Sequence, residues 1–189
     1  MMASRRLGTR NASYGLSYDA PVATIRTERL DLVLLDRAWL QAYVDAEPLP
    51  DLGFRDPGNF LGGSAHVVHL RADQLADDPG QQPWLLRAIV PRASGEAVGY
   101  VNFHAAPDER GMVEIGYRVL PAHRRQGYAS EAAEGIWRWA GRHGARVLRA
   151  SISPTNQPSL AMVRKAGFVQ VGQQIDDVDG LEIVFERPV

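Results

Sequence analysis

Alternating apolar and polar positions predict a run of short strands in the middle of the chain. Residues 84–90, 97–103 and 112–120 each alternate over a strand length, and short turns rich in glycine, proline and aspartate separate them. Strands joined by such short turns usually pair with their neighbours in an antiparallel order. The pattern therefore predicts an antiparallel meander.

The most regular helical pattern of the chain follows this meander. Apolar residues three or four positions apart, from Ala129 to Ala140, fall on one face, as in an amphipathic helix. Gly141 and Gly144 are expected to end the helix, because glycine readily adopts the left-handed conformation that follows a last turn. Trp139 falls outside the apolar face, so it is expected to contact a partner or to cover a neighbouring strand.

Weaker patterns predict the remaining elements. They are strands over residues 28–35, 147–153, 169–175 and 181–186, and helices over residues 36–44, 64–77 and 158–167. Asp36 can cap the first of these helices, and Pro158 occupies the first position of the last one, where proline is tolerated. Residues 46–63 contain several prolines and glycines and are expected to form an irregular loop.

The composition narrows the class of protein. A chain of 189 residues with 45% hydrophobic content can bury one sizeable core, and a formal net charge of -1 gives no overall positive field for binding nucleic acid. The absence of cysteine excludes disulfides and a cysteine nucleophile. No apolar run approaches the roughly 20 residues that span a bilayer, and no export signal is evident. We therefore expect a cytoplasmic protein without nucleic-acid or membrane partners.

A basic turn before the long helix has the composition of a phosphate-binding loop. Arg124 and Arg125 offer charged donors, while Gly127 and the small Ala129 allow the backbone to approach an anion closely. The N-terminus of the following helix adds a partial positive charge. The turn lacks the Gly-Lys-Ser/Thr ending of a P-loop and the glycine spacing of a dinucleotide fold. A polyanionic cofactor is the expected ligand, and an ordinary basic loop is the alternative.

Four motifs in a fixed order resemble those of the GNAT acetyltransferases. The family's acetyl-coenzyme A turn, Arg/Gln-x-x-Gly-x-Gly/Ala, is matched by residues 124–129, and later family elements are matched by residues 156–159 (Asn-Gln-Pro-Ser) and 165–168 (Lys-Ala-Gly-Phe). Residues 27–30 (Thr-Glu-Arg-Leu) look like the branch that includes ribosomal-protein N-terminal acetyltransferases. The resemblance covers about residues 25 to 187.

The resemblance implies an α/β (α+β) fold. It implies one GNAT-like domain over residues 25–189, with a mixed, mostly antiparallel central sheet of about six to seven strands and about four flanking helices, after an N-terminal arm over residues 1–24. The strands over 112–119 and 147–153 would splay apart and hold the pantetheine arm of acetyl-coenzyme A. The implied cofactor-binding residues are Tyr117, Arg118 and Val119 for the pantetheine, Arg124, Arg125, Gln126, Gly127, Tyr128 and Ala129 for the pyrophosphate, and Asn156 near the thioester.

The implied reaction is direct transfer of an acetyl group to a primary amine, either a protein N-terminus or a small molecule. Glu114 is the first candidate for the base, since many family members use a carboxylate near this position; its alternative role is a solvent-facing strand carboxylate. His104 is the second candidate. Val163 stands where many relatives have a tyrosine that protonates the departing sulfur. Ser159 or a water could replace that tyrosine, or the thiolate leaves without a dedicated acid.

Other interpretations stay open on the sequence alone. Val163 and the unsettled base also fit a non-catalytic acyl-coenzyme A sensor, and the basic turn also fits another phosphorylated ligand. His66 and His69 could face one metal, but no third ligand is evident, so no metal is expected. The relatives are often dimers, which makes a homodimer the expected assembly. Acidic residues in the irregular loop would suit a cationic amine, with a solvated loop as the favoured alternative: Asp45, Glu47, Asp51 and Asp56.

Overall fold

The computed structural model describes residues 24–177 and 180–189. Except for Thr24, the expected N-terminal arm lies outside the described residues, as does the tip of the closing hairpin at residues 178–179. The described residues form a single α/β domain. No helix among them is long and apolar enough to cross a membrane.

The described strands number eight, more than the six to seven expected. Their bounds are β1 Thr24–Arg26, β2 Leu30–Leu34, β3 Arg87–Pro91, β4 Gly99–Phe103, β5 Met112–Val119, β6 Val147–Ile152, β7 Val169–Asp176 and β8 Gly180–Pro188. The single strand expected over residues 28–35 is wrong at its start, because the chain turns between β1 and β2. The Thr27 hydroxyl accepts a hydrogen bond from the Leu30 N–H at 3.0 Å and stabilises this turn.

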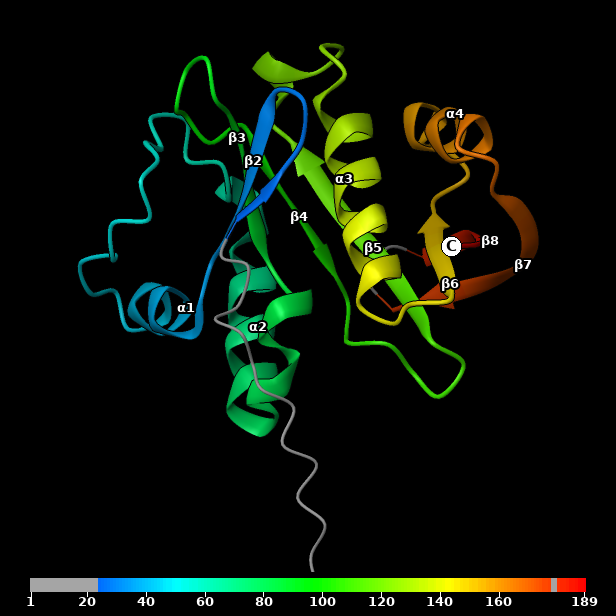
Figure 1. The fold of residues 1–189 in the computed structure, drawn as a ribbon, viewed down its shortest axis with the longest axis horizontal. Helices are drawn as coiled ribbons and strands as arrows, with labels where there is room; N and C mark the ends of the chain where they lie inside the picture. The colour runs from blue at the N-terminus through cyan, green and yellow to red at the C-terminus, as the bar shows by residue number, and fades with distance from the viewer. Residues whose placement is uncertain (1–23, 178–179) are drawn as a thin grey trace, which may run out of the picture.

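One sheet contains all eight of these strands, in the order β1-β2-β3-β4-β5-β6-β8-β7 (Figure 1). Every pair of neighbours is antiparallel except β5 and β6, which run parallel. The mixed, mostly antiparallel sheet is therefore confirmed, and the expected central meander corresponds to β3, β4 and β5.

Four α-helices flank the sheet, as expected. They are α1 Arg37–Val44, α2 Ala65–Asp77, α3 Tyr128–Arg142 and α4 Gln157–Lys165, with short 3-10 turns η1 Gly62–Ser64, η2 Pro79–Trp84 and η3 Pro121–His123. The Asp36 carboxylate accepts from the Trp39 N–H at 2.9 Å and caps α1. Trp84 was expected to begin the strand over residues 84–90 but belongs to η2, where Asp78 accepts from the Gly80 N–H and begins the turn.

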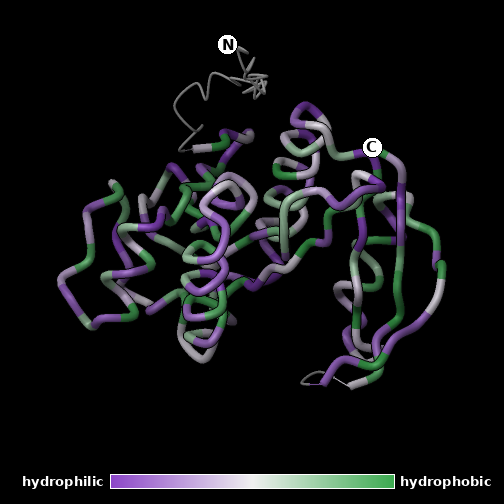
Figure 2. Tube along the Cα trace, turned by 90° about the horizontal axis from the view of Figure 1, so that it is seen from below, coloured by the Kyte–Doolittle hydropathy of each residue, from purple (hydrophilic) through white to green (hydrophobic). Residues whose placement is uncertain are grey.

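Two apolar cores lie on the two faces of the sheet. One contains Ile136 of α3 and Leu160 of α4, and the other contains Leu40 of α1 and Val68 of α2. Strand β3 contributes to both, because its side chains alternate: Ile89 packs into the first core, while its neighbours on either side pack into the second. Figure 2 shows hydrophobic and hydrophilic segments interspersed along the chain.

Trp139 widens the apolar face of α3 beyond the expected positions. Only 4% of its surface is exposed, and its ring lies 4.9 Å from that of Trp84 and 4.3 Å from that of His143. The ring also lies 5.4 Å from the guanidinium of Arg87 in β3, so covering a neighbouring strand is the one of the two expected roles that the structure supports.

The sheet opens between β5 and β6. Their register pairs only Met112, Val113 and Glu114 with residues 147–149, and beyond Glu114 the two strands separate. The splay implied by the family resemblance is therefore present. The opening lies between the N-terminus of α3 and that of α4. Most of the expected cofactor-binding residues lie around it.

Candidate active site

The splay leaves one edge of β5 without a neighbouring strand. The Glu114 carbonyl and the Leu120 N–H bond to the β4 side at 2.8 and 2.9 Å. Because alternate residues of an antiparallel ladder face the partner strand, Ile115, Tyr117 and Val119 direct their backbone groups toward the opening instead. Such an edge can pair with the amides of an extended ligand.

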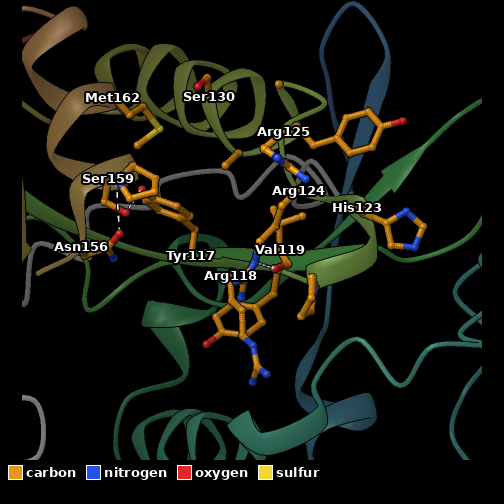
Figure 3. Close-up of a pocket in the computed structure, with 16 residues that line it drawn as sticks. Tyr117, Arg118, Val119, His123, Arg124, Arg125, Ser130, Asn156, Ser159 and Met162 are labelled. Atoms are coloured by element: carbon orange, nitrogen blue, oxygen red, sulfur yellow. Dashed lines mark hydrogen bonds between the residues drawn. The ribbon is translucent and has the colours of Figure 1, made fainter.

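A cleft of about 920 Å³ lies along this edge, between β5, the turn before α3 and the start of α4 (Figure 3). All the expected cofactor-binding residues except Gln126 line it: Tyr117, Arg118, Val119, Arg124, Arg125, Gly127, Tyr128, Ala129 and Asn156. The amide of Gln126 instead bonds the Ala122 carbonyl at 3.5 Å. The structure thus gathers residues that are spread over 40 positions of the sequence, from Tyr117 to Asn156, around one cavity.

Two arginines at the cleft direct their guanidinium groups to protein atoms. Arg124 Nε donates to the Val119 carbonyl at 3.1 Å, and Arg118 Nη1 donates to Ser64 Oγ at 2.6 Å. The Arg118 side chain consequently points away from α3 and α4 (Figure 3). The backbone of Arg118 pairs with Tyr100 of β4, so its expected contact with a cofactor stays a prediction.

The turn before α3 has the geometry of an anion site. Arg125 and Gly127 adopt positive φ angles of 61° and 82°, and Gly127 is the N-cap of α3. No side chain caps this helix, so the N–H groups of its first turn remain available. Tyr128, Ala129 and Ser130 of that turn line the cleft. A helix N-terminus of this kind binds phosphate through backbone donors and the helix dipole.

Glu131 ties this turn to the β1–β2 turn. Its carboxylate accepts from the Thr27 hydroxyl at 2.6 Å and from the Arg29 N–H and Nε at 2.7 Å each. Arg29 Nη1 also donates to the Gln126 carbonyl at 3.1 Å. Burial acts to raise the pKa of Glu131, but the bonds from Thr27 and Arg29 outweigh it and hold that pKa below its usual value. No local pattern of the sequence indicates Glu131, although the Thr-Glu-Arg-Leu motif holds both its partners, Thr27 and Arg29.

A second cavity, of about 600 Å³, lies on the side of β5 that faces α2. Residues of α2, β4, β5, β6 and the β7–β8 hairpin line it. It shares four lining residues with the first cleft: Tyr100, Tyr117, Asn156 and Ser159. The two cavities therefore meet where β5 and α4 face each other.

Both candidate bases line the second cavity. The His104 N–H bonds the Glu114 carbonyl, so these residues face each other across β4 and β5 with their side chains on the same side. Although His104 lies at the surface, protein atoms around its ring remove part of its hydration. This desolvation lowers the pKa of His104, and the charge of Arg71 adds to the effect, while Glu114 and Asp176 oppose it. The imidazole is thus mainly neutral at pH 7.

A pair of hydroxyls stands where the cavities meet. Tyr117 Oη donates to Ser159 Oγ at 2.7 Å. Burial raises the pKa of Tyr117, and the hydrogen bond to Ser159 partly offsets this. Asn156 Oδ1 accepts from the Ser159 N–H at 3.3 Å and thereby caps α4. Val163 is 0% exposed and belongs to the apolar core, so the position of the family's tyrosine carries no polar group here.

The acidic residues of the irregular loop do not line the second cavity: Asp45, Glu47, Asp51 and Asp56. Asp51 and Asp56 instead accept backbone N–H groups within the loop at 2.8 Å. The carboxylates at the cavity belong to Glu114, Asp176 and Glu182. The loop carboxylates are consequently a solvated set, and the acidic wall comes from β5 and the closing hairpin.

No group of three metal-binding side chains occurs within residues 24–177 and 180–189. His66 lies at the second cavity, and His69 is exposed one helical turn further along α2. This pair offers two imidazoles without a third ligand among the described residues.

Comparison with known proteins decides the family. A model of the acetyltransferase (GNAT) domain matches residues 64–169, more than half of the chain. The chain belongs to the GNAT acetyltransferase family. This GNAT acetyltransferase is similar to the uncharacterized N-acetyltransferase YjdG of Bacillus subtilis (strain 168). The two are 30% identical over 147 residues, and the match covers 77% of this chain and 86% of YjdG. It is accordingly an acyltransferase.

Solved structures share the fold of this GNAT acetyltransferase at low sequence identity. A ribosomal-protein-S5-alanine acetyltransferase from Vibrio fischeri has a TM-score of 0.59 at 14% identity, covering 87% of this chain and 96% of that one. The microcin C7 self-immunity acetyltransferase MccE, solved with acetyl-CoA and AMP, has a TM-score of 0.59 at 13% identity, covering 86% and 93%. These likenesses establish the fold.

Proposed function

We propose that this protein transfers an acetyl group from acetyl-coenzyme A to a primary amine by direct attack. One observation carries the proposal: two cavities on opposite sides of β5 meet at Tyr117, Asn156 and Ser159. A donor in one cavity and an amine in the other can then approach each other without a covalent enzyme intermediate.

The residues of the first cleft suit acetyl-coenzyme A, which supplies the activated acetyl group when it binds. The free edge of β5 offers backbone groups at Tyr117 and Val119 to the pantetheine amides. The N-terminus of α3 after Gly127 offers N–H donors to the pyrophosphate. The relative MccE was solved with acetyl-CoA, in line with this assignment.

Glu114 is the proposed base, with His104 as the second candidate. As the amine nitrogen forms its bond to the acetyl carbon, it must lose one proton, which Glu114 accepts directly or through a water. His104 lies beside Glu114, and its lowered pKa leaves it able to accept a proton at neutral pH. Either residue therefore performs the same step from the acceptor side of β5.

The hydroxyl pair of Tyr117 and Ser159 is the proposed acid. When the carbon–sulfur bond breaks, its electron pair stays on sulfur, and a proton from Ser159 neutralises the thiolate. Tyr117 donates a hydrogen bond to Ser159, so it can replace the proton that Ser159 loses. This pair takes the role that Val163 cannot perform.

The acceptor cavity favours an amine on a cationic molecule. Three carboxylates line this cavity, those of Glu114, Asp176 and Glu182. The buried guanidinium of Arg71 lines it as well, so negative groups outnumber it. A net negative wall raises the local concentration of cations and disfavours anions. A protein N-terminus and a small-molecule amine both remain compatible with this charge.

Thermal unfolding with acetyl-coenzyme A, coenzyme A, ATP and NAD tests the donor. A ligand at about 100 times its dissociation constant adds roughly 2.7 kcal/mol to the free energy of unfolding. A rise in Tm with the two coenzyme A ligands alone supports the proposal, and a larger rise with ATP or NAD contradicts it.

Release of free coenzyme A then tests the acceptor. The panel contains 1,5-diaminopentane, spermidine, a basic peptide with a free N-terminus, and glutamate as an anionic amine. Turnover with none of these amines would contradict the proposal. The homodimer and the cytoplasmic location remain predictions, the former checked by light scattering after size-exclusion chromatography.

A further inference from the structure

Asn102 of β4 presents an acceptor atom to the second cavity. Only 2% of its surface is exposed, yet it lines that cavity. Its Nδ2 donates to the Phe103 carbonyl at 2.8 Å. Because a carbonyl oxygen can only accept, this bond fixes the orientation of the amide and leaves Oδ1 as an acceptor. None of the residues 24–177 and 180–189 donates a hydrogen bond to Oδ1, and this atom is open to the cavity.

Gly116 provides the space beside this oxygen. It is paired with Asn102 across β4 and β5, and it also lines the second cavity. A Cβ at Gly116 would lie 3.2 Å from Asn102 Oδ1 and 3.0 Å from His104 Nε2. Two polar atoms from one face of β4 thus border the same small space, which any larger residue at Gly116 would fill.

Glu114 lies on the same side of β5 as this space. Residues two apart on a strand share a face, so Glu114 and Gly116 both face the second cavity. Arg71, the buried cation of the same wall, directs Nη1 to Gln74 Oε1 at 2.9 Å and to the His104 carbonyl at 3.0 Å. The Glu114 carboxylate is thus an acceptor on the same side as the space, while Arg71 Nη1 is held by acceptors of the protein.

We infer that Asn102 Oδ1 and His104 Nε2 bind the nitrogen of the acceptor amine over Gly116. The inference rests on the proposed function. A primary amine brings N–H donors, and both atoms accept when the imidazole is neutral with its proton on Nδ1. Because no protein group donates to Asn102 Oδ1, a bound amine can donate a hydrogen bond to it from the cavity. Asn102 is a positioning residue that directs the nitrogen lone pair away from β4.

Asn102→Leu and Gly116→Ala test the inference. The first variant removes the acceptor atom at similar volume, and the second fills the space without removing any polar group. We expect the KM of each for 1,5-diaminopentane or the basic peptide, whichever wild type acetylates, to rise about 10-fold or more. The Kd for acetyl-coenzyme A should stay unchanged, since neither residue lines the first cleft.

Gly172→Ala is the matched control, because it adds a Cβ to a strand glycine with nothing within 4 Å. Its KM should equal that of wild type. A wild-type KM in both Asn102→Leu and Gly116→Ala overturns the inference while leaving the proposed function intact. Absence of turnover by wild type would instead overturn the proposed function.

A measurement on the wild-type protein covers the case in which both variants misfold. The side-chain amide resonance of Asn102, in ¹⁵N-labelled protein, should shift when the accepted amine is added in the presence of coenzyme A. A resonance that stays in place at a saturating amine concentration overturns the inference.

Discussion

Tyr117 and Ser159 join β5 to α4 through a hydrogen bond of 2.7 Å between their hydroxyl oxygens. The two residues are 42 positions apart in the sequence, and the bond crosses the opening where the two cavities meet. Val163 stands at the position of the family's tyrosine, and it is buried in the apolar core and carries no proton donor. The hydroxyls of Tyr117 and Ser159 are therefore the candidates for protonating the departing sulfur.

Removing either hydroxyl should slow acetyl transfer without weakening donor binding. We expect Tyr117→Phe and Ser159→Ala to lower kcat about 10²-fold, the lower end of the usual effect of a general acid. Steady-state rates and the Kd of acetyl-coenzyme A check this. Tyr43→Phe, which removes a hydroxyl from a ring stacked on Trp39, should leave both values unchanged. Wild-type kcat in both test variants would show that the thiolate leaves unaided.

The rate of acetyl transfer should depend on pH through the candidate bases at the second cavity. Since desolvation lowers the pKa of His104, protonation of this imidazole should lower kcat/KM for the amine only below about pH 6.5, the ordinary value for histidine, whereas protonation of the amine itself acts near the amine's own pKa. Glu114→Gln should lower kcat by about 10² to 10⁴ if Glu114 is the base. His104→Gln should remove the acidic limb of the pH profile. An unchanged limb in His104→Gln would exclude titration of this residue as its cause.

Gly127→Ala should weaken acetyl-coenzyme A binding as well as stability. The φ of 82° strains any residue with a Cβ, and this Cβ would lie 3.1 Å from Arg29 Nη2. We expect a loss of about 1 kcal/mol of unfolding free energy and a higher Kd. Gly95→Ala, at a φ of 66° with nothing within 4 Å, should lose comparable stability and keep the Kd. Equal Kd values for the two variants would argue against the α3 N-terminus as the phosphate site.

Glu131→Gln should loosen the turn that precedes α3. We expect a loss of about 1 to 2 kcal/mol, since the carboxylate accepts three hydrogen bonds and solvent screens the half-exposed Arg29. The folded state lowers the pKa of Glu131, so its contribution is present above the unfolded value of about 4.5 and is lost as the pH falls through the lower folded value.

Urea unfolding at several pH values measures this contribution. The difference between wild type and Glu131→Gln should shrink below about pH 4.5. Glu134→Gln, in the same helix, changes an exposed carboxylate 3.9 Å from Arg138 and should cost little at any pH. A difference that does not depend on pH would mean that the carboxylate charge is unimportant.

The sequence alone determined the order of the elements and most of the candidate residues that line the first cleft. The periodicity of α3 and the alternation in β3 to β5 are local properties of the chain, and the phosphate turn is a contiguous segment with its own composition. Each can be read from neighbouring residues, because backbone geometry fixes which side chains share a face. The errors, at the β1–β2 turn and at Trp84, fall where a turn interrupts a run of apolar residues.

The sequence offered Glu114 and His104 as candidate bases, but the tertiary structure alone decided which other residues join them at the second cavity. Asn102, Gly116 and Glu114 come from two strands, and Asp176 and Glu182 from a hairpin far along the chain, so no local pattern relates them. Glu131 was missed for the same reason, since its partners Thr27 and Arg29 lie more than 100 positions away. Strand register sets these contacts, and the burial of both faces of the sheet fixes the register.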